Sequence, residues 1–466
     1  MEAVRTEDFI RAVKGTIANS GVAKRDTIHS ISIDSRTVRE GEVFFALRGE
    51  RFDGHDFIPE AISNGASMVV AKREWWDQKG SGSTHSLPFV IVDDTLKALG
   101  DFARYYRGLF DLKVVGITGA NGKTTAKDMT ASVLSEKFRV RKSIGNYNNL
   151  FGLPLSILQI SESDQVGIFE MGMSRPGEVA RLTQIGHPDI GVILNVGPVH
   201  LEFMQSVQKV AEAKFEMLQN LPEGALALLN GDDSYCLDMI SRWKGKAMTF
   251  GAAATCDFRA LEVHSNSSGY PSFTFNDLVE LKLSVLGDYN IHNALVASAV
   301  GTLLGLTPEE IKRGVERFAG TPMRMQKVSV GGLTILDDSY NANPTSMRNA
   351  LELLSQMKTK GKKVAVLGDM LELGERTKVY HQEIGHLAAK SGLDILVTVG
   401  ELGGEIAASA AGAELRVESF PRREEVVDFL LGELSQGDIL LVKASRAIGL
   451  EEVVDKVKSR FQKKRD

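Results

Sequence analysis

One short stretch of this sequence, residues 114–125, constrains the fold more than any other. It reads Val-Val-Gly-Ile-Thr-Gly-Ala-Asn-Gly-Lys-Thr-Thr. The apolar, β-branched residues that begin it are typical of a buried parallel strand. Gly119 and Gly122 lack a Cβ, so the backbone N–H groups around them can turn inward and cradle phosphate oxygens. The residues after Lys123 have helical spacing, and the positive end of that helix would face the same phosphates.

This pattern indicates a phosphate-binding P-loop. Lys123 supplies a mobile cation, and Thr124 supplies a hydroxyl that can ligate Mg²⁺. Ile117 stands where the common pattern has a small residue, and the first glycine is Gly116 instead. The alternative is a glycine-rich turn that binds no nucleotide, but strand, glycines, lysine and helix all favour the P-loop. The expected phosphate-binding residues are Gly119, Ala120, Asn121, Gly122, Lys123, Thr124 and Thr125.

Length and composition limit the class of protein. The chain has 466 residues, which predicts about three domains, and 43% hydrophobic with 25% charged residues is ordinary for a globular protein. The net charge of −5 gives no general attraction to nucleic acid or anionic lipid. No long apolar run predicts a membrane span, and Met1–Lys14 has no apolar core of a secretion signal. Cys236 and Cys256 have no metal or redox spacing. We therefore expect a reduced, cytoplasmic enzyme.

Alternating strands and helices predict an α/β chain of three domains. Residues 1–110 are expected to form a small α/β domain. Residues 111–322 surround the P-loop and predict a parallel sheet with helices on both faces. The pattern restarts near Met325, so residues 323–466 are expected to form a Rossmann-like, doubly wound domain.

Polar residues follow several of the expected strands. Glu170 should end a strand beside the P-loop strand, where a carboxylate can hold Mg²⁺ opposite Thr124, although a lone glutamate there is usually solvated. His200 is expected to end the next strand and to point at the same crevice, with a structural hydrogen bond as the alternative. In the first domain, Ser35 and Arg36 follow a strand, and on their own they are best explained as a solvated turn.

A dense polar block follows the first strand of the third domain. Residues 336–344 read Leu-Asp-Asp-Ser-Tyr-Asn-Ala-Asn-Pro, a set suited to ribose hydroxyls or to a peptide, and Pro344 can open a helix. A capping turn is the alternative. Arg324 precedes the domain junction, and Lys443-Ala-Ser-Arg446 follows the last strand. Basic residues of this kind can close an anionic site from across a cleft.

Successive blocks of the chain resemble the Mur ligases, ATP-dependent amide ligases of bacterial wall synthesis, and the likeness covers essentially the whole chain in order. In that family the small residue of the ATP loop lies where Gly116 does. The blocks that carry the resemblance are Gly116–Thr125, Asn146–Asn149, Glu170–Gly172, Asn195–Glu202 and Ala213–Glu216. Three further blocks are similar to the branch that joins D-alanyl-D-alanine to UDP-N-acetylmuramoyl-tripeptide: Asp338–Pro344, Leu367–Gly374 and Val442–Arg446.

The resemblance implies that the first domain binds the UDP-sugar, the second ATP, and the third the dipeptide and part of the nucleotide. It implies two Mg²⁺ ions, ligated by Thr124, Glu170, His200 and a carbamylated Lys214. The alternative for Lys214 is a surface lysine paired with Glu216 or Glu212. The implied catalytic residues are Lys123, Glu170, His200 and Lys214.

The resemblance also implies the remaining contacts. Asn290 and Asn293 would face the adenine, and Arg324 and Asp338 the rest of the nucleotide, while Tyr289 stands where the family has a histidine. The implied substrate-binding residues are Ser35, Arg36, Asn146, Asn149, Tyr340, Asn341, Asn343, Lys443, Ser445 and Arg446.

The implied reaction activates the terminal carboxyl of the tripeptide as an acyl phosphate, which the amine of the dipeptide then attacks. One alternative is a ligase that adds a single amino acid to a muramyl peptide or to folate. Against it stands Tyr340–Pro344, where those branches carry a histidine-containing block. Another is a P-loop nucleotide switch, which predicts an Asn-Lys-x-Asp motif that the chain lacks. We expect a monomer, and the third residue of the tripeptide stays open between lysine and diaminopimelate.

Overall fold

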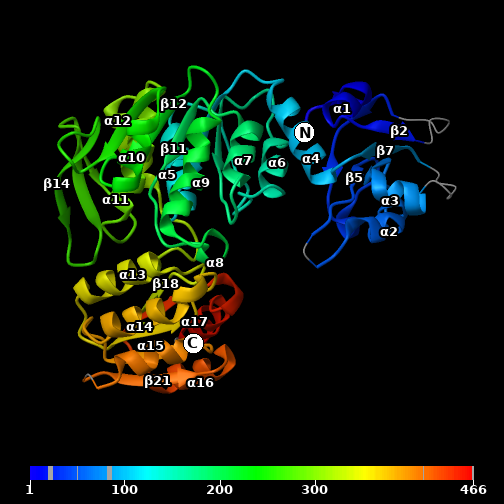
Figure 1. The fold of residues 1–466 in the computed structure, drawn as a ribbon. Helices are drawn as coiled ribbons and strands as arrows, with labels where there is room; N and C mark the ends of the chain where they lie inside the picture. The colour runs from blue at the N-terminus through cyan, green and yellow to red at the C-terminus, as the bar shows by residue number, and fades with distance from the viewer. Residues whose placement is uncertain (19–24, 50, 81–86, 413, 464–466) are drawn as a thin grey trace.

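The computed structural model describes residues 1–18, 25–49, 51–80, 87–412 and 414–463. Three α/β units follow one another along the chain, each built on its own main sheet (Figure 1). The central unit contacts both of the others, and the N-terminal unit projects to one side (Figure 1). The expected three-part α/β class is confirmed, while the expected boundaries at 110/111 and 322/323 stay predictions.

The N-terminal unit is built on a small, mostly parallel sheet. Its strand order is β2 (Thr16–Ala18), β7 (Phe89–Val92), β6 (Met68–Lys72), β5 (Val43–Phe45) and β4 (Ile31–Ser32), and only the β2–β7 pair is antiparallel. A separate antiparallel pair joins β1 (Val4–Arg5) to β3 (Thr27–Ile28). The helices of this unit are α1 (Thr6–Ala12), α2 (Ile58–Ser63), α3 (Arg73–Trp75) and α4 (Thr95–Arg107).

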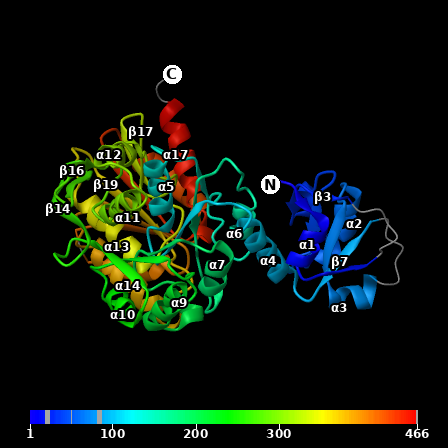
Figure 2. The same cartoon turned by 90° about the horizontal axis from the view of Figure 1, so that it is seen from above.

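Helix α4 joins the N-terminal unit to the central one (Figure 2). As the sequence predicts, Asp94 caps it, accepting a hydrogen bond from the Lys97 amide at 2.8 Å. Near its other end, the Tyr106 hydroxyl donates to Ile160 O at 2.6 Å and accepts from the Glu2 amide at 2.7 Å. Burial raises the pKa of Tyr106 to about 12, so this hydroxyl keeps its proton. The helix thus belongs to the cores of two units.

The P-loop strand β8 (Lys113–Thr118) lies inside the sheet of the central unit. The strands run in the order β9 (Val140–Lys142), β10 (Val166–Glu170), β8, β11 (Ile190–Ile193), β12 (Leu226–Asn230), β13 (Lys246–Gly251) and β14 (Phe258–Ser265). These pair in parallel, and β15 (Pro271–Phe275) and β16 (Val279–Lys282) extend the edge in antiparallel. The helices are α5 (Lys123–Leu134), α6 (Gly152–Ile157), α7 (Glu178–Gly186), α8 (Leu201–Met204), α9 (Val207–Gln219), α10 (Ser234–Arg242), α11 (Asn290–Leu303) and α12 (Pro308–Arg317).

The strand register decides where two candidate residues lie. Strand β10 pairs with β8 and sets Glu170 opposite Ile117, so the expected neighbour of the P-loop strand is confirmed. The expectation that His200 ends the next strand is wrong, because β11 stops at Ile193. Pro198 has no N–H for a ladder, and the chain turns before His200, which stands at the start of α8 with a φ of 52°.

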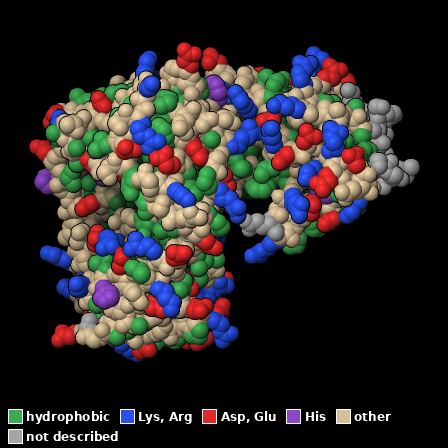
Figure 3. Space-filling view, in the orientation of Figure 1, with side chains coloured by type: hydrophobic (Ala, Val, Ile, Leu, Met, Phe, Trp, Pro, Cys, Tyr) green, Lys and Arg blue, Asp and Glu red, His purple; other side chains and the backbone are tan. Residues whose placement is uncertain are grey.

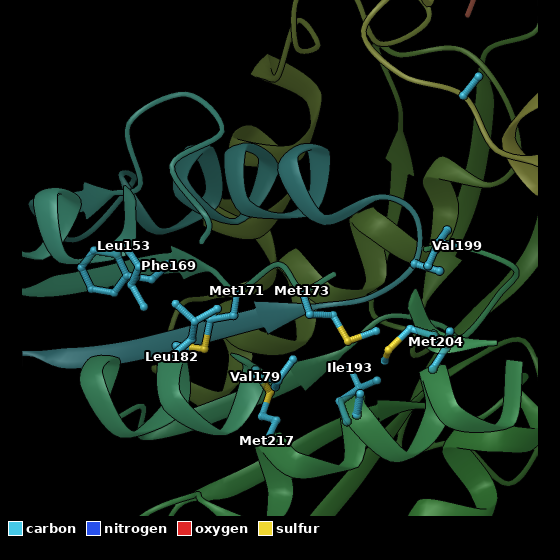
Figure 4. Close-up of a cluster of buried hydrophobic side chains, with 14 of the residues drawn as sticks. Leu153, Phe169, Met171, Met173, Val179, Leu182, Ile193, Val199, Met204 and Met217 are labelled. Carbon is cyan, nitrogen blue, oxygen red and sulfur yellow. The ribbon is translucent and has the colours of Figure 1, made fainter. Parts of the chain in front are cut away.

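Apolar side chains fill the layers on both faces of the central sheet. Figure 4 shows one layer, in which Phe169 of the sheet lies beside Leu153 of α6, Val179 of α7 lies near Met217 of α9, and Ile193 of the sheet lies on the side of Met204 of α8, all buried. The opposite face packs against α5 and α11. Burying each large apolar side chain contributes about 1.5–3 kcal/mol, so both layers hold the carboxyl end of β8 rigidly in place.

The C-terminal unit repeats the α/β arrangement. Its strand order is β17 (Gln326–Val330), β18 (Leu333–Asp337), β22 (Ile439–Lys443), β19 (Lys363–Gly368), β20 (Ile395–Val399) and β21 (Arg416–Phe420), with only β17 antiparallel. Helices pack on both faces, as expected of a doubly wound sheet. They are α13 (Pro344–Gln356), α14 (Thr377–Ala388), α15 (Gly403–Ala410), α16 (Arg423–Glu433) and α17 (Glu451–Lys463).

Candidate active site

A cavity of about 640 Å³ opens at the carboxyl ends of β8 and β10, between the central and C-terminal units. The central unit supplies the P-loop and the loop before α6, the C-terminal unit supplies the polar block after β18, and α4 contributes Leu96. The candidate residues that line it are Ala120, Asn121, Gly122, Lys123, Thr124, Thr125, Asn146, Asn149, Glu170, His200, Asn290, Asn293, Arg324, Asp338, Tyr340, Asn341, Asn343 and Lys443.

The P-loop holds its lysine close to the loop itself. Gly122 has a φ of 84°, and a Cβ there would lie 2.6 Å from Asn293 Oδ1, so only glycine fits. Lys123 starts α5, and its Nζ donates to Gly119 O at 2.8 Å and to Ala120 O at 3.4 Å. Burial lowers the pKa of Lys123, and the nearby carboxylate of Glu170 opposes that shift. The ammonium therefore lies at the P-loop bound to two backbone carbonyls, and the phosphate of a nucleotide would replace these weaker partners.

A buried carboxylate faces the P-loop threonine. Glu170 is 1% exposed, and its Oε2 accepts from the Thr124 hydroxyl at 2.8 Å. Its Oε1 accepts from Asn148 Nδ2 at 2.7 Å. Carboxylate, hydroxyl and amide oxygens are the ligands that Mg²⁺ prefers, so this pair fits one ion shared with phosphates. Across the described ranges, however, no three or more His, Cys, Asp or Glu side chains gather as a metal site.

His200 lines the same cavity but is engaged with the C-terminal unit. Its Nδ1 lies 2.5 Å from Glu372 Oε2, and this hydrogen bond lowers the pKa of Glu372. The backbones of the two segments are also hydrogen-bonded, since the Glu202 amide donates to Glu372 O at 3.1 Å. Sequence reasoning missed Glu372 as a site residue, although it lies in the Leu367–Gly374 block that carries the family resemblance.

Lys214 is buried, so its interpretation as a surface lysine is wrong. Lys214, on α9, is 2% exposed, and the described part of the chain offers its ammonium no ion pair. Glu212 pairs with Arg242 at 2.8 Å, and Glu216 accepts from backbone amides at the start of α7. Burial, and then the charge of Lys123, holds the pKa of Lys214 well below its usual range.

The polar block of the C-terminal unit is tied together by charge. Asp338 Oδ2 accepts from Lys443 Nζ at 2.6 Å, and the same ammonium donates to Asn341 O at 2.9 Å. The Arg324 guanidinium stacks over the Tyr340 ring at 4.1 Å. Arg324 therefore keeps its N–H groups available to an anion in the cavity.

Two asparagine pairs lie beside the P-loop, and one of them joins this block to it. Asn343 Nδ2 donates to Asn121 Oδ1 at 2.7 Å, while Asn343 Oδ1 caps α13 by accepting from the Ser346 amide at 2.9 Å. Asn293 Nδ2 donates to Asn290 Oδ1 at 2.7 Å beside Gly122. Tyr289, in the position of the family's histidine, also lines the cavity, and burial raises its pKa well above the usual range.

The other candidates lie outside the cavity lining. Ser35 bonds to Glu60 at 2.5 Å and Arg36 pairs with Asp34 at 2.6 Å, both in the N-terminal unit. Ser445 is buried and its Oγ accepts from the Leu371 amide at 2.9 Å, and Arg446 pairs with Glu451 at 2.9 Å. Gly119 lies behind the P-loop lysine, where its carbonyl accepts from Lys123.

Known proteins match this chain along almost its entire length. The descriptions "Mur ligase family, catalytic domain", "Mur ligase middle domain" and "Mur ligase, glutamate ligase domain" match residues 27–107, 117–301 and 323–446. UDP-N-acetylmuramoyl-tripeptide–D-alanyl-D-alanine ligase of Bacillus subtilis is 35% identical over 96% of this chain and 97% of that protein. The chain belongs to the Mur ligase family. This Mur ligase is accordingly an ATP-dependent ligase of peptidoglycan precursor synthesis.

Two solved structures extend the likeness to the fold of this Mur ligase. MurF ligase from Thermotoga maritima, in complex with ADP, superposes with a TM-score of 0.83 at 32% identity, covering 94% of this chain and 98% of that one. UDP-N-acetylmuramoylalanyl-D-glutamyl-2,6-diaminopimelate–D-alanyl-D-alanyl ligase from Acinetobacter baumannii gives 0.86 at 27% identity, covering 98% and 99%.

Proposed function

We propose that this Mur ligase joins D-alanyl-D-alanine to the terminal carboxyl of UDP-N-acetylmuramoyl-tripeptide, with release of ADP and phosphate. One observation carries the proposal. The P-loop and the polar block Asp338–Asn343 line a single cavity, in a chain similar over its full length to ligases of that name. The N-terminal unit would bind the UDP-sugar, the central unit ATP, and the C-terminal unit the dipeptide and part of the nucleotide.

The first step follows from the charges that meet in the cavity. A carboxylate that attacks ATP is one anion approaching another, so the γ-phosphate must be neutralised. Lys123 and the loop amides would do this, with Arg324 on the facing side. Mg²⁺, when bound at Thr124 and Glu170 with His200 nearby, would supply further neutralising charge. The carboxylate oxygen then bonds to the γ-phosphorus and the bond to ADP breaks.

The second step forms the amide. The free amine of D-alanyl-D-alanine attacks the acyl carbon, and phosphate leaves from the tetrahedral intermediate. Tyr340, Asn341 and Asn343 would bind the dipeptide, and Asn146 and Asn149 the tripeptide. Contact between the C-terminal unit and the P-loop, such as the bond from Asn343 to Asn121, would help to keep water from the acyl phosphate.

Lys214 is proposed to act as a carbamate. Its lowered pKa favours the neutral amine, which is the form that bonds to CO₂ and releases a proton. The product would carry a negative charge close to Lys123 and could bridge to a second Mg²⁺. A buried amine that forms no ion pair with any described residue fits this modification, because the carbamate would attract the positive charge of Lys123, which repels the ammonium.

Phosphate release measured with different acceptors tests the function. Turnover should require both UDP-N-acetylmuramoyl-tripeptide and D-alanyl-D-alanine. Release that needs only a single amino acid, or a shorter muramyl peptide, would replace the proposal with one of the related ligases. Release without any acceptor amine would indicate a nucleotide switch.

The location and the oligomeric state are also proposed. We propose a cytoplasmic monomer, and the cytoplasmic location fits the two cysteines, Cys236 and Cys256, which are both free and buried. No helix in residues 1–463, where described, is long and apolar enough to cross a membrane. Light scattering of the purified chain measures the mass directly.

A further inference from the structure

Arg175 places a guanidinium in the lining of the active-site cavity. Arg175 lies in the loop between β10 and α7, is exposed, and lines the same cavity as Glu170. It stacks over the Phe203 ring at 5.1 Å, which holds the group in place without using its N–H donors. Within the described ranges, no carboxylate forms an ion pair with it.

The loop around Arg175 is firmly held. Glu178 Oε2 accepts from the Ser174 amide at 2.6 Å and from the Arg175 amide at 3.0 Å. This leaves the backbone fixed while the side chain reaches toward the cavity. Such a geometry is prearranged for an anionic ligand, because little ordering of the chain is needed on binding.

The carboxylates that line the cavity are already engaged. Glu170 accepts from Thr124, Glu372 from His200, Asp338 from Lys443, and Glu178 from the two loop amides. Among the described residues, Arg175 therefore has no carboxylate partner, and a ligand anion is the simplest one. Arg324 is another guanidinium of the lining that forms no ion pair among the described residues, but it lies on the C-terminal side, next to Tyr340.

The location of Arg175 indicates which part of the ligands would contact it. Helix α7, directly after its loop, packs on α4, and Leu96 of α4 lines the same cavity. This is the side on which the N-terminal unit lies, and Figure 3 shows Lys and Arg side chains along the gap between the units. A tripeptide reaching from the N-terminal unit to Glu170 would pass Arg175 before its terminal carboxyl reached the P-loop.

The chemistry of the tripeptide supplies a second carboxylate. The Acinetobacter enzyme is named for a substrate with a D-glutamyl residue ahead of the last one. A glutamyl residue inside a peptide uses one of its two carboxyl groups in the chain and keeps the other free. We propose that Arg175 is a specificity residue that binds this non-reacting carboxylate of the tripeptide. The inference rests on the proposed function.

Substrate amidation combined with mutation tests the pairing. Arg175→Gln removes the charge from an exposed side chain, so the protein should fold normally. With the free-acid tripeptide, this variant should show about a 10- to 100-fold higher KM and nearly unchanged kcat, as loss of a charge-assisted hydrogen-bond pair predicts. With a tripeptide whose glutamyl carboxylate is a carboxamide, wild type and Arg175→Gln should have equal KM values. Arg175→Lys should retain part of the preference for the free acid.

The controls separate the possible failures. Arg376→Gln removes another guanidinium stacked on an aromatic ring, Tyr380 at 4.9 Å, outside the cavity lining, and should keep the wild-type preference. An equal loss on both tripeptides in Arg175→Gln overturns the inference, as does a matching rise in the KM for ATP. If wild type uses neither tripeptide with D-alanyl-D-alanine, the proposed function fails instead.

Discussion

The side chain of Asn343 makes two hydrogen bonds whose contributions can be separated. Its Oδ1 caps α13 through the Ser346 amide, and its Nδ2 donates to Asn121 of the P-loop. Losing an N-cap costs about 1 kcal/mol, and losing a partly buried neutral hydrogen bond costs about another 1 kcal/mol. Asn343→Ala should therefore destabilise the start of α13 by about 2 kcal/mol. Asn343→Ser keeps a capping oxygen but is too short to reach Asn121, so it should cost only about 1 kcal/mol.

Amide hydrogen exchange in the first turn of α13 measures these values locally, which avoids assuming two-state unfolding in a chain of several units. Asn121→Ala, alone and combined with Asn343→Ser, completes a double-mutant cycle with an expected coupling of about 0.5–1.5 kcal/mol. Because Asn121 belongs to the P-loop, Asn343→Ser should also lower kcat/KM for ATP by about 5- to 10-fold. A coupling of zero, with unchanged kinetics, would refute the bridge between the units.

Three further predictions concern charge at the phosphate site. Lys123→Ala should abolish phosphate release from a folded protein, since the lysine acts as a point charge; near-normal release would contradict the P-loop assignment. Glu170→Gln and His200→Ala should raise the Mg²⁺ concentration needed for half-maximal activity, and an unchanged Mg²⁺ requirement in titrations would remove either residue from the metal site. Lys214→Met should fold with a stability within about 1.5 kcal/mol of wild type, because the side-chain volume is kept and a buried polar group is removed, yet be nearly inactive. Lys214→Ala, which leaves space in the site, should be nearly inactive and partly rescued by short carboxylic acids, and full activity of Lys214→Ala without them would exclude a carbamate role.

Much of the central fold could be predicted because its signals are local. The apolar strand β8 runs directly into the glycines of the P-loop, and Asp94 directly precedes the helix that it caps. Each signal therefore lies within a few residues of the structure that it predicts. Strands β17 and β21 have no apolar run that would predict them, since they read Gln-Lys-Val-Ser-Val and Arg-Val-Glu-Ser-Phe, and both lie at sheet edges. An edge strand forms because it pairs with a neighbouring strand that is distant in sequence. The local sequence pattern contains no information about that neighbour.

Parts of the candidate site depend on contacts between distant segments. Nothing near His200 in sequence indicates Glu372, since the pair forms only when two units meet. The block around Lys214, with glutamates on both sides, reads as a solvated helix face, and its burial follows from how α9 packs on the sheet. Ser445 follows a strand as expected, but it turns toward Leu371 and away from the cavity.

The anchoring of Tyr106 has a practical consequence for dissecting this enzyme. Its hydroxyl is hydrogen-bonded both to the Glu2 amide of the N-terminal unit and to Ile160 O of the central unit. A truncation between the two units would therefore remove a partner of α4 on whichever side the helix is kept. A truncated protein that starts after α4 would expose the apolar faces of α6 and α7 to water and invite aggregation. Compounds that target the cavity are therefore best screened against the intact chain, because an excised ATP-binding piece would offer them an artificial surface.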